Sequence, residues 1–353
     1  MTQANSTVTV VIPGDLHLTE SGLDNHTAAQ LVVAEVNGLI RPDFVQFIGD
    51  NVQDATEEQF RLFDELRDRL EVPHFALVGD HDVKDDPGAG RFRAHLGATF
   101  GATSLRGFRF LRLDTQQAKP LGIAEEQLAW FRAQVDEATA AGERVVIFQH
   151  NYPYQIWESF AGPGLDAWRE VVQTRRIAAI FAGHTHYGQV ANDGRNVAIA
   201  TRSIGDPEGG PPGYTIAHLD GENLAVTYRA VIDEGPIVLV THPRDLLLAT
   251  GPAHVVTGPD AVRVRVWSSS TLSTLRGRLD DGDWSGLEFL GAGLWTAPLP
   301  GDRLAKGEHA YEVEAVDAEG RRGGQRLGFL VDPTGRFTAV PGVRPAVTVT
   351  KFC

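Results

Sequence analysis

Five short apolar runs in the N-terminal part of the chain end abruptly in polar clusters that contain Asp or His. The runs span residues 7–12, 44–48, 74–78, 144–148 and 177–182. They lead into the clusters Asp15-Leu16-His17, Gly49-Asp50-Asn51, Gly79-Asp80-His81-Asp82, Gln149-His150 and Gly183-His184-Thr185-His186. Ionisable side chains are costly to bury beside apolar strands unless something pairs them. The clusters are therefore expected to meet one another around a common partner.

The segments between the apolar runs are typical of amphipathic helices. Residues 56–70 place Phe60, Phe63 and Leu66 at helical spacing, and residues 123–139 show the same pattern. Alternation of strands and helices predicts α/β layers around a largely internal sheet. Ligands bind outside the carboxyl ends of the strands of such sheets, so the five clusters are expected to converge on one edge.

The residue types in the clusters indicate a metal site. Asp and His suit borderline and hard metal ions, and the only cysteine, Cys353, leaves no thiolate site inside the chain. Seven ligands suffice for two metals if one carboxylate is shared, and Asp50 in the middle of the series is the natural bridge. Two metals about 3.5–4 Å apart can generate a hydroxide and stabilise the attacking and leaving oxygens of an in-line displacement.

The ordered set Asp-X-His, Gly-Asp, Gly-(Asn)-His-Asp, His and Gly-His-Thr-His resembles the calcineurin-like metallophosphoesterase superfamily, over roughly residues 8–230. Residues 110–115 and 122–131 further resemble the branch that contains cyclic-nucleotide phosphodiesterases and purple-acid-phosphatase relatives. The resemblance implies a four-layer α/β/β/α sandwich with a dinuclear centre at one end. The tyrosine that purple acid phosphatases use near the residue matching Asp50 is missing, which disfavours that subclass.

The resemblance also implies a role for each clustered residue. Asp15, His17, Asp50 and His186 would surround the first metal, and Asp50, Asp80, His150 and His184 the second. His81 would contact the phosphate and assist the leaving group, with Asp82 orienting its imidazole. Asn51, Tyr152 and Tyr187 adjoin these residues and are predicted to line the substrate pocket. The implied cofactors are two divalent or mixed-valence ions of manganese, iron or zinc.

Asp80 departs from the family pattern, which has asparagine at this position. With two divalent ions, three carboxylates and one bridging hydroxide, the core charge is 4 − 3 − 1, or zero, whereas asparagine would leave it at +1. Metal charge is what lowers the pKa of a bound water. We expect Asp80 to bind the second metal more tightly than asparagine would, or to favour a trivalent ion there.

Near residues 233–243 the alternation of strand-like and helix-like segments gives way to strand-like segments alone. Residues 261–270, 307–321 and 325–332 alternate in polarity or form apolar runs between Gly- and Asp-rich turns, which predicts a small antiparallel β-sandwich. We therefore expect a metallophosphoesterase domain over 1–233 and an all-β sandwich with a C-terminal tail over 234–353. The second domain resembles immunoglobulin-like or fibronectin-type modules, a resemblance that carries no chemistry.

Net charge restricts the partners of this chain. The 353 residues carry a formal charge of -14, which repels polyanions and disfavours binding to nucleic acid or anionic membranes. The first residues lack the pattern of a signal peptide, and no run of about 18 apolar residues could span a bilayer. A cytoplasmic location is expected, although immunoglobulin-like modules often lie outside the cytoplasm. A homodimer stays open.

Together these features predict a metal-dependent phosphoesterase. We expect hydrolysis of a small phosphodiester by a metal-bridging hydroxide, with His81 helping to protonate the leaving oxygen. A phosphomonoesterase is the nearest alternative. A non-catalytic metal-binding scaffold that acts through the β-sandwich domain is the alternative from another class.

Overall fold

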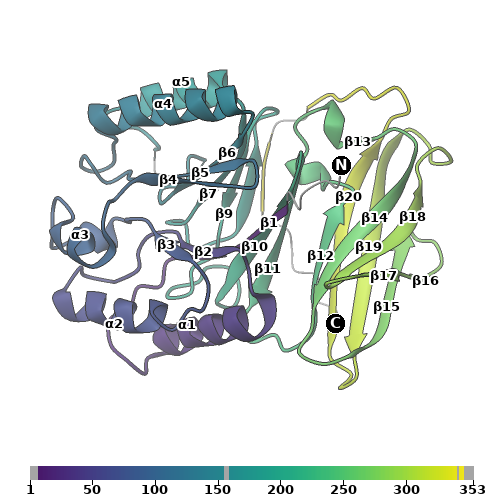
Figure 1. Ribbon diagram of the computed structural model, residues 1–353, viewed down its shortest axis with the longest axis horizontal. Coiled ribbons are helices and arrows are strands. Elements are labelled where there is room, and N and C mark those ends of the chain that lie inside the picture. Colours follow the sequence, from purple (N-terminus) through teal and green to yellow (C-terminus); the bar gives the residue numbers. More distant parts are fainter. Residues whose placement is uncertain (1–6, 155–158, 340–341, 346–353) are drawn as a thin grey trace.

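The computed structural model describes residues 7–154, 159–339 and 342–345 of the chain. Its N-terminal part contains two β-sheets that pack face to face (Figure 1). The first sheet has the order β11-β10-β1-β2-β3, formed by β1 (Thr7–Pro13), β2 (Phe44–Phe47), β3 (His74–Ala76), β10 (Gly213–Asp220) and β11 (Asn223–Ala230). Strands β1, β2 and β3 are parallel, so their carboxyl ends lie at one edge.

The second sheet has the order β21-β8-β9-β7-β6-β5-β4. Its strands are β4 (Gly101–Leu105), β5 (Phe108–Leu113), β6 (Arg144–Gln149), β7 (Ile177–Ala182), β8 (Gln189–Asn192), β9 (Val197–Ala200) and β21 (Gly342–Pro345). Strands β5, β6 and β7 are parallel. Side chains from both sheets, including Val10, Phe44, Phe110 and Phe148, form one fully buried layer between them.

Helices cover the outer face of each sheet. Helices α1 (Asp24–Glu35), α2 (Glu57–Arg67) and α3 (Gly90–Leu96) pack on the first sheet, and α4 (Glu125–Ala141) and α5 (Leu165–Thr174) pack on the second. Helix α2 begins where Thr56 caps it, because its side chain accepts from the amide of Gln59. The predicted four-layer α/β/β/α sandwich is confirmed.

The C-terminal part is an all-β sandwich of two sheets, which are ordered β12-β14-β18-β17 and β13-β20-β19-β15-β16. The strands are β12 (Ile237–His242), β13 (Val255–Val256), β14 (Pro259–Trp267), β15 (Leu272–Leu279), β16 (Ser285–Gly286), β17 (Glu288–Gly291), β18 (Leu294–Pro300), β19 (Gly307–Asp317) and β20 (Arg322–Val331). Their inward side chains, such as Val264, Val313 and Phe329, form a separate core. The division of the chain at residue 233 stays a prediction.

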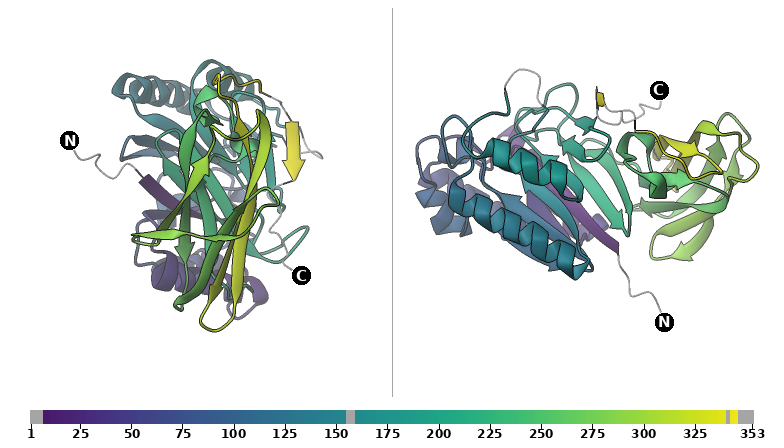
Figure 2. Two further views of the ribbon diagram at one scale, coloured as in Figure 1. Left: turned by 90° about the vertical axis from the view of Figure 1, so that its right-hand side faces the viewer. Right: turned by 90° about the horizontal axis from the view of Figure 1, so that it is seen from above.

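Polar contacts join the sandwich to the α/β layers, which lie side by side in Figure 2. The side chain of Gln325 donates to the carbonyl of Val226 at 3.1 Å, and Arg244 donates to the carbonyl of Glu222 at 2.7 Å. Strand β21 leaves the sandwich and pairs with β8 in the second sheet. The predicted C-terminal tail therefore contributes one strand to the α/β part, and residues 346–353 lie outside the described residues. Within the described part, no helix is long and apolar enough to cross a membrane.

Candidate metal centre

All five polar clusters meet at one end of the α/β sandwich. Asp15, Asp50 and Asp80 follow β1, β2 and β3 of the first sheet, while His150 and His184 follow β6 and β7 of the second. Because these strands run parallel within each sheet, their carboxyl ends present the side chains at a shared edge. The expected convergence is confirmed.

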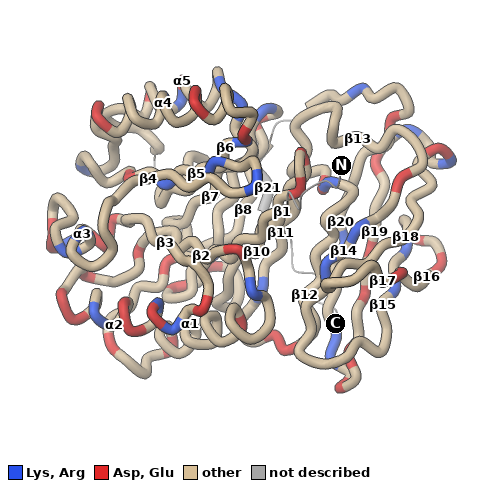
Figure 3. Tube along the Cα trace, viewed as in Figure 1, with Lys and Arg blue, Asp and Glu red and all other residues tan. Residues whose placement is uncertain are grey.

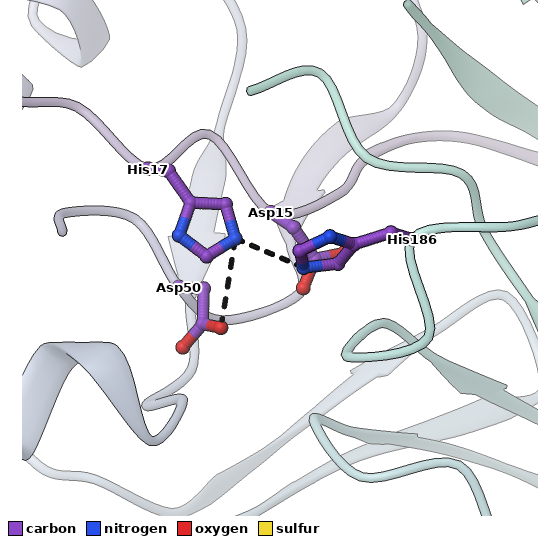
Figure 4. Close-up of side chains that lie close together, drawn as sticks. All are labelled: Asp15, His17, Asp50 and His186. Carbon is purple, nitrogen blue, oxygen red and sulfur yellow. Dashed lines mark hydrogen bonds and ion pairs between the residues drawn. The ribbon is translucent and has the colours of Figure 1, made fainter. Parts of the chain in front are cut away.

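The first group of candidate ligands contains Asp15, His17, Asp50 and His186, and one ligand atom from each lies within 4.8 Å of the others (Figure 4). The Nε2 atoms of His17 and His186 are 3.0 Å apart, and His17 Nε2 is 3.8 Å from Asp50 Oδ2. One Asp15 oxygen, Oδ2, is buried without a hydrogen-bond partner among the described residues. An uncompensated carboxylate oxygen beside facing imidazole nitrogens suits a bound cation.

The second group contains Asp50, Asp80, His150 and His184. His150 Nε2 lies 3.2 Å from Asp50 Oδ2 and 3.0 Å from Asp80 Oδ1. His184 Nδ1 approaches the same Asp80 oxygen at 3.0 Å. Asp50 is therefore common to both groups, as a bridging carboxylate would be. The nitrogen and oxygen donors, with no thiolate, fit two ions of the borderline or hard class.

Most of these candidate ligands have a left-handed backbone. The φ angles are 42° for Asp15, 47° for His17, 48° for Asp50, 67° for His184 and 57° for His186. Non-glycine residues rarely adopt this region, and each such residue costs on the order of 1 kcal/mol. Such strain concentrates at functional sites, where the surrounding structure enforces it. Five of the eleven non-glycine residues with positive φ in the described part of the chain are thus candidate ligands.

Glycines next to the candidate ligands allow the loops to approach closely. A Cβ on Gly79 would lie 2.2 Å from Asp50 Oδ1, and one on Gly49 would lie 2.4 Å from His150 Nδ1. Gly49 also has a φ of +98°, which favours glycine. The Gly-Asp pairs of the sequence therefore have a steric reason: the side chain of one loop occupies the space beside the glycine of another.

Burial and mutual contact shift the pKa values of the clustered groups. Burial raises the pKa of Asp15 and lowers that of His17. Burial also opposes ionisation of Asp80, but hydrogen bonds from His150 and His184 prevail and hold its pKa well below the usual range. The carboxylate of Asp80 is thus ionised, which is the form that binds a cation.

The predicted partnership of Asp82 and His81 is wrong. His81 Nδ1 lies 2.7 Å from the carbonyl oxygen of Gln53, which holds the ring instead. Asp82 is fully buried and accepts hydrogen bonds from the amides of Gly79 and Val52 and from Asn51 Nδ2. Its carboxylate fastens the loop after β3 to the loop after β2.

Gln53 is a site residue that the sequence analysis missed. Its side-chain Oε1 lies 2.9 Å from His17 Nδ1, while its carbonyl binds His81. The two imidazole rings meet edge to face, with their centroids 4.6 Å apart. In the sequence, the only sign that Gln53 belongs to the site is that it lies three residues after Asp50.

Of the three predicted pocket residues, two lie in the protein interior. Asn51 is fully buried and donates to the carbonyl of Leu77 as well as to Asp82. Tyr152 is also fully buried, in the core between the second sheet and its helices. Both positions argue against substrate contact. Tyr187 is partly exposed.

The loop after β9 adds a second feature that the sequence analysis did not assign to the centre. The amide of Glu208 donates to the carbonyl of His186 at 3.0 Å, and the amide of Gly205 donates to that of Asp15 at 2.8 Å. Asp206 Oδ2 lies 3.6 Å from His186 Nδ1. The Gly- and Pro-rich segment 203–214 therefore contacts the first group of candidate ligands through its first residues.

Residues 8–188 match the family model described as calcineurin-like phosphoesterase. The chain belongs to this family. The match spans the five clusters and ends just after His186, so it includes every candidate ligand of the metal centre.

Two curated relatives are phosphodiesterases by name. A probable glycerophosphodiester phosphodiesterase of Arcobacter nitrofigilis is 26% identical over 200 residues, which cover 50% of this chain and 71% of the relative. A probable cyclic nucleotide phosphodiesterase of Moraxella catarrhalis is 25% identical over 204 residues, which cover 52% of this chain and 72% of the relative.

Solved structures share the α/β fold. A dimetal phosphatase from Danio rerio aligns with a TM-score of 0.53 and 14% identity, over 64% of this chain and 96% of the other. A purple acid phosphatase from yellow lupin (Lupinus luteus) aligns with a TM-score of 0.52 and 15% identity, over 65% and 52% of the two chains. At these identities the likeness concerns the fold.

Proposed function

We propose that this chain hydrolyses small phosphodiesters at a dinuclear metal centre. The observation that carries the proposal is the pair of four-residue donor groups that share Asp50. Asp15, His17, Asp50 and His186 would hold one ion, and Asp50, Asp80, His150 and His184 the other. Two such ions, of manganese, iron or zinc, supply an activated nucleophile and neutralise charge on the phosphate.

The chain's own residues contribute orientation and a proton. The carbonyl of Gln53 binds His81 Nδ1, so a protonated His81 can direct its Nε2–H toward the oxygen of the leaving group. The proton moves from Nε2 to that oxygen as the phosphorus–oxygen bond breaks. Gln53 Oε1 binds His17 Nδ1 in the same way, which directs the other ring nitrogen toward His186 and Asp50.

A small diester is preferred over a monoester and over long nucleic acid. Both curated relatives carry phosphodiesterase names, one for glycerophosphodiesters and one for cyclic nucleotides. Acidic residues outnumber basic ones along α2, which contains Glu57, Glu58, Asp64 and Glu65 beside Arg61 and Arg67. Red and blue segments both mark this helix in Figure 3. An acidic surface repels a polyanion, while the single charge of a small diester meets less repulsion than the double charge of a monoester.

The β-sandwich supports this activity without supplying chemistry. We propose that residues 1–233 and 234–353 form two domains, the second of them immunoglobulin-like with a C-terminal tail whose strand β21 returns to the first domain. Its role would be to brace the α/β layers through contacts such as Gln325 to Val226. A cytoplasmic location and a homodimer remain part of this proposal.

The test is hydrolysis of bis(4-nitrophenyl) phosphate and 4-nitrophenyl phosphate with manganese supplied. We expect turnover of the diester, faster than of the monoester, and loss of both in Asp50→Asn. The matched control is Asp193→Asn, which changes an Asp of the β8–β9 turn. Turnover of the monoester alone would favour a phosphomonoesterase. Metal binding without turnover of either substrate would favour the scaffold.

A further inference from the structure

A second polar site lies away from the candidate metal centre, at the open edge of the α/β sandwich. Strand β3 is the last strand of the first sheet, and β4 is the last strand of the second. Between them is a cavity of about 260 Å³, lined by residues that include Arg67, His74, Phe75, Phe100 and Arg112. The residues that line this cavity include none of the seven candidate ligands of the metal centre. The two sites are therefore distinct.

Arg112 places a cation in an apolar layer. Alternate residues of a strand share a face, so Arg112 lies on the same face of β5 as Phe108 and Phe110. Both phenylalanines are buried between the two sheets. The guanidinium carbon of Arg112 lies 4.3 Å from the centre of the Phe75 ring, which comes from the opposite sheet. The cation thus points into the interior of the sandwich rather than toward its helices.

No carboxylate compensates this cation. Among residues 7–154, 159–339 and 342–345, none lies within ion-pair distance of Arg112. A guanidinium has five N–H donors. Two of them, one on each terminal nitrogen, donate to Thr103 Oγ1 at 3.2 Å. The other three have no protein acceptor in the described part of the chain. Burial accordingly lowers the pKa of Arg112 to about 10.

Arg67 is the other cation that lines the cavity, and the protein already supplies acceptors for it. Arg67 donates to Asp64 at 2.8 Å and to the carbonyl of His95 at 3.2 Å. The terminal nitrogen Nη1 of Arg67 is 3.4 Å from His74 Nε2. Arg112 is therefore the unpaired cation of the cavity, and its fork of N–H donors is available to a ligand. Pairing stabilises a partly buried charge, so an anion would be favoured there.

We propose that this cavity binds a small organic anion, in which a carboxylate or phosphate group is joined to an apolar body. The anionic group would accept from Arg112, since a guanidinium matches two oxygens of such a group. The apolar body would pack on Phe75 and Phe100. The volume is below the range of about 300–1,000 Å³ that holds drug-sized ligands, so the ligand has the size of a single substituted ring.

The test measures binding of benzoate to the whole, metal-loaded protein by isothermal titration calorimetry. Benzamide, which has the same shape without the charge, is the first control. We expect saturable binding of benzoate and at least tenfold weaker binding of benzamide. Phenylphosphonate, which is not a phosphoester, tests whether a phosphate-type group is preferred. Equal affinity for benzoate and benzamide, or no saturable binding of either anion, would overturn the proposal.

Variants assign the binding to this cavity. Arg112→Met is expected to weaken benzoate binding at least tenfold, because the cavity loses the cation that no described carboxylate pairs. The matched control is Arg109→Met on the other face of β5, where Arg109 is paired with Glu143 at 2.7 Å. It should bind benzoate as the unchanged protein does. If Arg112→Met does not fold, benzoate binding is measured on Arg112→Lys instead, which keeps the positive charge.

The metal centre is the competing location for an anion. Asp50→Asn removes the carboxylate common to both donor groups but leaves the cavity intact. We expect it to bind benzoate with unchanged affinity. If Asp50→Asn abolishes binding while Arg112→Met does not, the anion binds at the metal centre and the cavity proposal fails.

Discussion

His81 Nδ1 lies 2.7 Å from the carbonyl oxygen of Gln53, so the main chain of the loop after β2 orients this imidazole. The neighbouring carboxylate of Asp82 faces the other way, toward the amides of Gly79 and Val52. Two adjacent residues thus have separate tasks. In the proposed mechanism His81 acts on substrate, whereas Asp82 holds two loops together.

This separation predicts different losses from substitutions at the two positions. His81→Ala should lower kcat by about 10²–10⁴ for alkyl diesters, whose leaving oxygen needs a proton. The loss should be smaller for nitrophenyl diesters, whose leaving group departs without one. Metal content, measured by plasma mass spectrometry, should be unchanged. Equal losses for both leaving groups would show that His81 is not the proton donor.

Asp82→Asn should act on stability instead. Asn replaces one of the two accepting oxygens with an NH2 group, which cannot accept from the N–H group that faces it. We therefore expect a loss of about 1–3 kcal/mol in unfolding free energy. Urea unfolding of Asp82→Asn and of the exposed control Asp85→Asn measures the difference. An Asp82→Asn protein as stable as the control would contradict the loop-fastening role.

Gly79→Ala is expected to damage the metal centre by sterics alone. The new Cβ would lie 2.2 Å from Asp50 Oδ1 and 2.4 Å from the Asp50 amide nitrogen, and the latter cannot move without moving the loop. We expect less bound manganese and a lower Tm than in the unchanged protein. Gly38→Ala is the control, because its Cβ would have no atom within 4 Å. Normal metal content in Gly79→Ala would argue against the close approach of the two loops.

The shared position of Asp50 predicts a difference in metal stoichiometry. Asp50→Asn weakens both donor groups, so both ions should be lost on dialysis, whereas His186→Gln weakens only the first group and should retain one. Plasma mass spectrometry after dialysis measures the number of metal ions that each variant retains. Removal of the metal with a chelator should lower Tm in the unchanged protein, because an ion that binds only the folded state stabilises it. Retention of one ion by Asp50→Asn would contradict a bridging role.

His218 predicts a loss of stability in acid. Burial, with a smaller effect from Arg265, lowers its pKa from 6.5 to about 3, so the folded protein keeps it neutral. The contribution to stability is therefore fully present above pH 6.5 and is lost as the pH falls from 6.5 toward 3. Its maximum slope is about 1.4 kcal/mol per pH unit. His218→Gln should flatten the decline of unfolding free energy over this interval, and an unchanged slope would contradict the assignment.

The sequence by itself determined the layers and the residues that meet in the candidate metal centre. Helix α2 repeats apolar residues with helical spacing, so its local pattern alone predicts it. Each polar cluster directly follows a strand, so the topology of the sheets alone predicts where the clusters lie. Helix α1 was not predicted, because Leu31 is half exposed while His26 is buried, and the polarity of its residues does not follow its faces.

Only the tertiary structure decided which side chains face each other. Gln53, rather than Asp82, binds His81 because the path of one loop sets which acceptor lies within reach. Tyr152 follows His150 by two residues but turns into the core. The isolation of Arg112 depends on two strands that come from different sheets. Sequence spacing fixes what a strand end carries, but a hydrogen bond or a charge pair depends on distances between segments that are remote along the chain.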